Sequence, residues 1–213
     1  RVERLEAFDL KDYLAALRDE RGYKPATLSR VISSLRVFFR WAEEEGIVKV
    51  NPARSLHNPK KGKKLPIYLT PDEAQQALEG PPSQEKEPLR DQTVIITLVM
   101  AGIRLAELVG LDCSDLDFET GTIRVLGKGR KERLVPMNAA LREALRQWLA
   151  ARPVPHEGCP ALFLGHDGTR ISRRTVQYVV KKTAKRLGLD PRLSPHKLRH
   201  TFATILYAEA VEL

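Results

Sequence analysis

The stretch VLGKGRKERLVP, residues 125–136, decides the class of fold. Two segments rich in apolar and β-branched residues, 122–126 and 132–136, meet in this stretch. They predict antiparallel strands joined by a tight glycine-containing turn. Lys128 stands between two glycines in that turn, where the strands would aim it toward a ligand, although a lysine on a tight turn is usually just solvated. Neither nucleotide-binding glycine pattern fits, because Glu132 stands where GxGxxG needs glycine and GxxxxGK[ST] is absent.

Upstream of this hairpin, the stretch AGIRLAEL at residues 101–108 follows an apolar helical pattern at Pro88–Ala101. Gly102 ends that helix, and a short helix begins directly after Arg104. An unpaired buried charge is costly, so Arg104 must pair with a carboxylate or face an anionic ligand. Glu107, three residues further on, is the candidate partner for a purely structural ion pair.

Downstream, the stretch SPHKLRHTF at residues 194–202 begins the last predicted helix. Pro195 suits the first helical position, so His196 and Arg199 lie in the first turns, near the positive helix end where phosphate binds well. A basic helix start with a histidine packed nearby is the alternative. His196 and His200 are four residues apart, but HExxH would need a glutamate between them and no third ligand is evident, so no metal is expected.

Four acidic residues, Asp112, Asp115, Asp117 and Glu119, raise the question of a metal a second time. The spacing does not fit a calcium-binding EF-hand loop: with Asp115 first, Gly121 falls at position seven and not at position six. Apolar residues alternate with the acids, so a half-exposed strand or turn is the better interpretation. No local signature of a nucleophilic triad is recognisable.

Helical patterns dominate the rest of the chain. Two amphipathic helices are predicted near the start, at Leu10–Arg21 and Pro25–Glu45. Helix caps are predicted at Thr70, Asn138 and Ser172, each before a helical pattern. A weak third strand is predicted at residues 161–164.

One segment, NPKKGKKLP at residues 58–66, is the linker candidate, because proline stands near both ends. It contains four lysines: Lys60, Lys61, Lys63 and Lys64. We therefore predict a helical domain at residues 1–58, a linker at 59–66 and a mostly helical domain with a small sheet at 67–213.

The charge distribution indicates an anionic partner. The 213 residues carry 36 Lys and Arg against 27 Asp and Glu, a net charge of +9. Residues 1–64 carry a net of +6, residues 65–119 a net of −8 and residues 120–213 a net of +11. Two basic segments around an acidic one suit two domains that grip one polyanion, with nucleic acid first among the candidates. Solvated helix faces are the alternative interpretation.

Other features narrow the class of protein. The longest apolar run, Thr93–Ile103, is too short for a bilayer, which needs about 20 residues. Cys113 and Cys159 form no CxxC pair, so a reducing compartment is the default and a disulfide scaffold is not expected. The chain is therefore predicted to be a folded cytoplasmic protein without a membrane segment.

Together the three motifs resemble the tyrosine recombinase (phage integrase) family, and its bacterial Xer type most closely. They are AGIRLAELVGL around Arg104, VLGKGRKERLVP around Lys128 and SPHKLRHTFAT around His196 and Arg199, in matching order and spacing. The stretch TLSRVISSLRVFFRWAEEEGIVKVNPA, residues 27–53, resembles the family's core-binding domain. The resemblance implies a mainly α fold: a helical SAM-like domain followed by a mixed α+β catalytic domain with a small antiparallel sheet.

The resemblance implies site-specific DNA recombination through a 3′-phosphotyrosyl intermediate. Arg104 and Arg199 match the two arginines that bind the non-bridging phosphate oxygens, and such planar guanidiniums donate forked hydrogen bonds. Lys128 matches the general acid for the 5′-oxygen, and His196 matches a histidine that assists proton transfer or phosphate binding. Glu107 would orient Arg104. The reaction implies no cofactor, neither a divalent metal nor ATP.

The implied partner is double-stranded DNA with a specific recombination site. The linker lysines, together with Arg173 and Arg174 at a helix start, are candidates for phosphate contacts. The family implies a homo- or hetero-tetramer on two DNA sites, a DNA translocase as a candidate regulator and a nucleoid-associated location. Chromosome dimer resolution, phage integration and transposon movement remain open as biological settings.

The nucleophile is the one departure from the family pattern. Its tyrosine follows the second arginine by roughly 30–35 residues, whereas this chain ends 14 residues after Arg199. Tyr207 lies only eight residues on, within the same predicted helix, and is rejected. The resemblance therefore predicts a nucleophile in a C-terminal tail outside this chain. A non-catalytic DNA-binding protein on the same fold and a metal-dependent nuclease are the alternatives.

Overall fold

The structure, a computed structural model, describes residues 2–60, 68–79 and 88–211. The chain forms two compact units, Arg1–Leu65 and Pro66–Leu213, which are described separately. Among the described residues, no helix is both long enough and apolar enough to cross a membrane.

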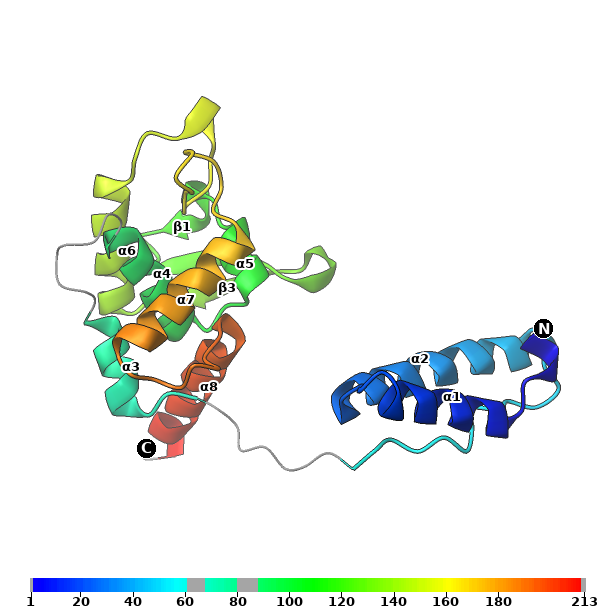
Figure 1. The fold of residues 1–213 in the computed structure, drawn as a ribbon. Coiled ribbons are helices and arrows are strands. Elements are labelled where there is room, and N and C mark those ends of the chain that lie inside the picture. The colour runs from blue at the N-terminus through cyan, green and yellow to red at the C-terminus, as the bar shows by residue number, and fades with distance from the viewer. Residues whose placement is uncertain (1, 61–67, 80–87, 212–213) are drawn as a thin grey trace. The chain divides into compact units, whose positions relative to one another are not determined.

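The first unit is built on two helices, α1 (Ala7–Asp19) and α2 (Pro25–Glu44), after a 3₁₀ turn, η1 (Val2–Arg4) (Figure 1). Helix α1 begins at Ala7, before the predicted start at Leu10. The Asp9 carboxylate caps it by accepting a hydrogen bond from the backbone N–H of Glu6 at 2.8 Å. The hydrophobic core of this unit consists of Leu10, Ile32, Phe39, Ala42, Val48, Ala53 and Leu56.

The second unit is mainly helical and contains one small sheet (Figure 1). Its helices are α3 (Pro71–Leu78), α4 (Pro88–Ala101), α5 (Leu105–Gly110), α6 (Ala139–Ala151), α7 (Arg173–Arg186) and α8 (Pro195–Val211). Its strands are β1 (Leu116–Asp117), β2 (Thr122–Leu126) and β3 (Glu132–Pro136). Three 3₁₀ turns, η2 (Cys113–Asp115), η3 (Lys128–Arg130) and η4 (His156–Gly158), lie between them. The predicted fold class is confirmed.

The predicted helix caps form through side-chain hydrogen bonds. Thr70 accepts from the backbone N–H of Glu73 at 3.2 Å, and the Glu73 carboxylate accepts from that of Thr70 at 2.8 Å, which makes a capping box. Asn138 and Ser172 accept from the first turns of α6 and α7 at 2.9 and 3.0 Å. Short-range polar patterns therefore fix where these helices start.

The sheet has the antiparallel order β1-β2-β3, and β2 and β3 form the predicted hairpin. Val125 lies opposite Arg133 and Ile123 lies opposite Val135, so these four side chains share one face of the sheet. Figure 1 shows the β2–β3 turn, which contains η3, projecting from the body of the second unit. The turn is therefore free to approach a ligand.

The strand predicted at residues 161–164 is wrong. The third strand is β1, and residues 161 and 164 make only isolated bridges. The run is fully buried, but side chains satisfy the carbonyl groups of Ala161 and Leu162 in place of a neighbouring strand. The Trp148 indole N–H donates to the Leu162 carbonyl at 2.9 Å, and the Arg152 guanidinium donates to the Ala161 carbonyl at 2.6 Å. A buried apolar run does not reveal which partner its backbone will find.

Helix α4 forms the centre of the second unit and packs against α3, α6, α7 and α8. Thr93 and Thr97 lie on it with no exposed surface, and each hydroxyl donates to the carbonyl four residues earlier at 2.7 Å. Because these polar groups are satisfied within the helix, α4 can be surrounded by apolar neighbours on all sides.

Helix α8 packs against the end of α4 at Gly102. The backbone of Gly102 is left-handed, with a φ of 56°, and a Cβ atom there would lie 2.2 Å from the Phe202 ring. Only glycine therefore lets Phe202 pack at this point. The same helix is held by the buried Thr201 hydroxyl, which accepts a hydrogen bond from the backbone N–H of Leu69 at 2.9 Å.

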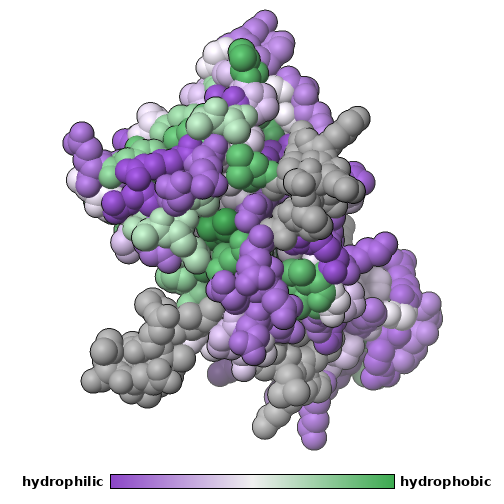
Figure 2. Space-filling view, turned by 90° about the vertical axis from the view of Figure 1, so that its left-hand side faces the viewer, coloured by the Kyte–Doolittle hydropathy of each residue, from purple (hydrophilic) through white to green (hydrophobic). Residues whose placement is uncertain are grey.

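The surface carries the mixed polarity expected of the composition. On the face shown in Figure 2, hydrophilic residues predominate and hydrophobic residues lie in patches between them.

Gly102→Ala should destabilise the second unit by roughly 3 kcal/mol, because about 1 kcal/mol comes from the left-handed backbone and the rest from overpacking against Phe202. Urea unfolding followed by circular dichroism measures the change. Gly188→Ala is the matched control: Gly188 has a φ of 65° with no atom within 4 Å of a Cβ. It should lose only about 1 kcal/mol. Equal losses in the two variants would contradict the packing role of Gly102.

Candidate active site

Glu107 is the buried acidic group on which the predicted site is built. It lies in the first turn of α5, and its side chain is only 4% exposed. One carboxylate oxygen, Oε2, accepts a hydrogen bond from the backbone N–H of Arg104 at 2.7 Å. The other, Oε1, accepts from Arg104 Nη1 at 2.9 Å. The predicted contact between these two residues is therefore present, while the Arg104 side chain remains 57% exposed.

Arg133 is a second partner of Glu107 that the sequence analysis missed. Its Nη1 donates to Oε1 at 2.9 Å and its Nη2 to Oε2 at 2.8 Å, a forked pair between β3 and α5. The register of the hairpin held the signal. Arg133 shares a sheet face with the buried Val125 and Val135, where a charged side chain requires a partner.

These contacts keep Glu107 ionised. Burial by itself raises the pKa of the carboxyl, but hydrogen bonds from Arg133, from the Arg104 backbone and from the Arg104 side chain outweigh that effect. The net result lowers the pKa of Glu107 from 4.5 to about 2. The same pair raises the pKa of Arg133. Glu107 is thus an anchor for cations and cannot serve as a base near neutral pH.

Arg199 approaches the same carboxylate from α8. Its Nη1 donates to the carbonyl oxygen of Gly102 at 2.6 Å and lies 3.8 Å from Glu107 Oε2. Its side chain is 32% exposed. The fold therefore brings Arg104, Arg199 and Arg133 around one carboxylate, which leaves an excess of two positive charges. Fixed guanidiniums of this kind suit the oxygens of a phosphate group.

His196 lies three residues before Arg199 on α8, and its ring is exposed. Its Nε2 is 3.1 Å from Nε2 of His200, and the two rings meet edge to face. A hydrogen bond between two ring nitrogens needs one donor and one acceptor, so one of the two nitrogens carries no proton. Among the described residues, no group of three metal-ligating side chains occurs.

Lys128 is placed by its backbone in η3, the turn between β2 and β3, and its side chain lies outside the described part of the structure. The turn is closed by the backbone N–H of Gly127, which donates to the carbonyl of Lys131 at 2.8 Å. The hairpin carrying Lys128 is the one that Arg133 ties to Glu107.

The predicted phosphate contacts are only partly described. Lys60 is exposed in the first unit, and Arg173 and Arg174 are exposed in the first turn of α7. Lys61, Lys63 and Lys64 lie outside the described residues.

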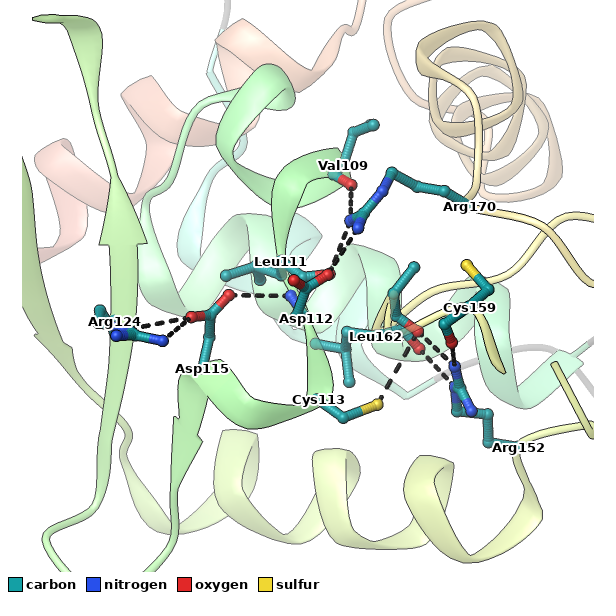
Figure 3. A network of polar contacts seen from close by, with 11 residues as sticks. Val109, Leu111, Asp112, Cys113, Asp115, Arg124, Arg152, Cys159, Leu162 and Arg170 are labelled. Carbon is teal, nitrogen blue, oxygen red and sulfur yellow. Dashed lines mark hydrogen bonds and ion pairs between the residues drawn. The ribbon is translucent and has the colours of Figure 1, made fainter. Parts of the chain in front are cut away.

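A separate polar network fastens the far end of α5 (Figure 3). Arg170 donates to the carbonyls of Val109 and Leu111 at 2.9 and 3.1 Å and to the Asp112 carboxylate at 2.6 Å. Asp115 accepts from the backbone N–H of Asp112 and from Arg124 of β2, each at 2.9 Å. Two of the acids that raised the question of a metal therefore bind arginines, Asp112 binding Arg170 and Asp115 binding Arg124.

Comparison with known proteins identifies the family of the chain. Residues 68–213 match the phage integrase family, and residues 1–46 match the family's N-terminal SAM-like domain. The chain belongs to the phage integrase family. Its resemblance to tyrosine recombinases is thus confirmed.

Curated relatives of this family member are bacterial tyrosine recombinases. The chain is 40% identical over 216 residues to tyrosine recombinase XerC of Corynebacterium glutamicum, which covers 100% of this chain and 70% of that protein. It is 39% identical to XerC of Thermodesulfovibrio yellowstonii, over 91% of this chain and 66% of that protein. The chain therefore spans about two thirds of the length of such relatives.

Solved structures show the same fold. The XerH site-specific recombinase bound to its difH substrate is 26% identical, with a TM-score of 0.76, over 96% of this chain and 60% of that one. The Tn1549 transposon integrase in complex with circular intermediate DNA is 21% identical, with a TM-score of 0.82, over 98% of this chain and 74% of that one. The second likeness concerns the fold alone.

Glu107→Gln should remove a stabilisation of roughly 3 kcal/mol at pH 7, since each unit of pKa shift corresponds to about 1.4 kcal/mol. The folded-state pKa is depressed, so this stabilisation is present above pH 4.5 and is lost as the pH falls toward 2. Urea unfolding of both proteins from pH 7 to pH 2.5 measures the difference. A difference that stays constant over this range would contradict the low pKa.

Proposed function

We propose that the complete protein is a site-specific recombinase that cleaves and rejoins DNA strands through a 3′-phosphotyrosyl link. The observation that carries this proposal is the pair of guanidiniums, Arg104 and Arg199, held against one buried carboxylate in a member of the phage integrase family. Charge on the non-bridging oxygens grows in the transition state, and fixed donors lower its energy.

In the proposed reaction each group has one task. The tyrosine oxygen bonds to phosphorus as its proton passes to the His196 ring or to water, and the bond from phosphorus to the 5′-oxygen breaks. Arg104 and Arg199 donate to the non-bridging oxygens, and Lys128 gives a proton to the departing 5′-oxygen. His196 holds or moves a proton beside the phosphate. The phosphotyrosyl link is itself a phosphodiester and conserves the energy of the broken bond. Rejoining is therefore the reverse attack by a 5′-hydroxyl and needs neither a metal nor ATP.

The proposed substrate is double-stranded DNA with a specific recombination site, bound by a homo- or hetero-tetramer in the cytoplasm. A DNA translocase is a candidate regulator. The exposed Lys60, Arg173 and Arg174 are proposed to contact phosphates, with Lys61, Lys63 and Lys64 beside Lys60 in the sequence. The net charges of +6 and +11 on the two basic segments support a grip by both units.

The complete gene product should form a covalent adduct with a nicked duplex that carries its site, the site being recovered by binding selection from random duplexes. Arg104→Lys and Arg199→Lys keep the charge but lose the fork, so each should slow adduct formation by about 10²–10³-fold. Arg18→Lys, in an exposed pair with Asp19, is the control and should leave the rate unchanged.

Three results would decide against this mechanism. Site-specific binding without any adduct from the complete protein would favour a non-catalytic DNA-binding protein. Loss of strand cleavage with EDTA would favour a metal-dependent nuclease. Full activity of both Arg104→Lys and Arg199→Lys would show that the forked guanidiniums are not needed for the reaction.

The double variant Arg173→Gln, Arg174→Gln should weaken DNA binding and reduce the slope of log affinity against log salt by about 1–2, since each phosphate contact contributes about 0.9. Fluorescence anisotropy of a labelled duplex over a salt series measures both quantities. Arg146→Gln is the control and should leave the slope unchanged, because this guanidinium packs over the Phe118 ring, 5.4 Å from its centre. An unchanged slope in the double variant would exclude both residues from the phosphate contacts.

A further inference from the structure

Arg133 is the described residue that joins the hairpin to the cluster of guanidiniums. We propose that Arg133 is a positioning residue, which acts through Glu107 to hold Arg104 at a fixed place relative to the β2–β3 turn that carries Lys128. The inference rests on the proposed function, because it assigns a task in that reaction to a residue whose guanidinium is bound to Glu107.

The hydrogen bonds on Glu107 show why the position of Arg104 depends on Arg133. Each oxygen of the carboxylate accepts one bond from each arginine, all between 2.7 and 2.9 Å. The carboxylate therefore cannot rotate without breaking bonds to both partners. Without Arg133 each oxygen loses a donor in a site that is almost closed to solvent, which favours protonation or rotation of Glu107. Either change releases the Arg104 guanidinium, which is more than half exposed.

The Arg133 guanidinium also lies near the base of the turn. Arg133 pairs with Val125 near the end of the strand ladder, and a Cβ atom on Gly127 would lie 3.5 Å from Arg133 Nη1 and 3.8 Å from Glu107 Oε1. The guanidinium and the carboxylate thus lie close to Gly127, the residue directly before Lys128. One forked pair thereby fixes both the helix start at Arg104 and the base of the lysine turn.

Arg124 on the neighbouring strand provides a matched comparison. Arg124 also forms an ion pair near α5, at 2.9 Å, but its partner is Asp115 (Figure 3). The Arg124 side chain is 50% exposed. In the register it lies opposite Leu134, on the sheet face away from Arg133. Loss of Arg124 removes the same charge from the same hairpin and leaves the bonds to Glu107 intact.

Single-turnover cleavage of the nicked duplex by the complete protein, at saturating DNA, tests the inference. Arg133→Gln should lower the rate about 10²-fold, as loss of one preorganised donor does, with the DNA affinity within about threefold of the wild type. Arg133→Lys, which keeps the charge but loses the fork, should recover about tenfold. Arg124→Gln should stay within about threefold of the wild-type rate.

A double variant separates positioning from general damage to the fold. If Arg133 acts through Glu107, Arg133→Gln should cause no further loss in a Glu107→Gln background, within about threefold. Losses that multiply in the double variant would overturn the inference. So would an equal loss in Arg133→Gln and Arg124→Gln, or a normal rate in Arg133→Gln.

A readout without catalysis keeps this inference separate from the proposed function. In the 213-residue chain, carbon-13 NMR titration of Glu107 should show its pKa rising in Arg133→Gln and unchanged in Arg124→Gln. If the wild type formed no adduct, the proposed function would fail. The titration would still test whether Arg133 holds Glu107 ionised. An unchanged pKa in Arg133→Gln would overturn the inference in either case.

Discussion

The buried carboxylate of Glu107 is the constraint on which the site depends. A charge with 4% of its side chain exposed is tolerated only if it is fully paired, and Arg104, Arg133 and Arg199 supply that pairing from three elements. Removing a single partner would leave a charge in a nearly closed site, so these elements must stay together. The excess positive charge they create is directed outward through Arg104.

The packing of helices delivers the second guanidinium to that carboxylate. Arg199 is 97 residues from Gly102 in the chain, yet it donates to the Gly102 carbonyl at 2.6 Å. This contact exists because Gly102 has no side chain where the Phe202 ring packs. One glycine therefore ends α4, seats α8 and receives the arginine, which couples the stability of the core to the geometry of the site.

Local patterns predicted much of this arrangement, and the misses have physical causes. Helix caps such as Thr70 and the hairpin around Lys128 depend on neighbouring residues, so they could be predicted from short stretches of sequence. Strand alternation indicates that Arg133 needs a partner on the buried face of the sheet, but it does not reveal that this partner is Glu107 of α5. The prediction of a strand at residues 161–164 was wrong because Trp148 and Arg152 take up the carbonyls of Leu162 and Ala161, and these contacts arise only in the folded core. The functional roles of Arg104, Lys128, His196 and Arg199 stay predictions.

A structure of the complete protein bound to DNA with its recombination site tests the central claim most directly. Arg104 and Arg199 are predicted to donate hydrogen bonds to the non-bridging oxygens of the same phosphate, while Glu107 contacts only the arginines and backbone around it. DNA bound with its phosphates on other residues, and with the Arg104–Arg199 site empty, would contradict the account.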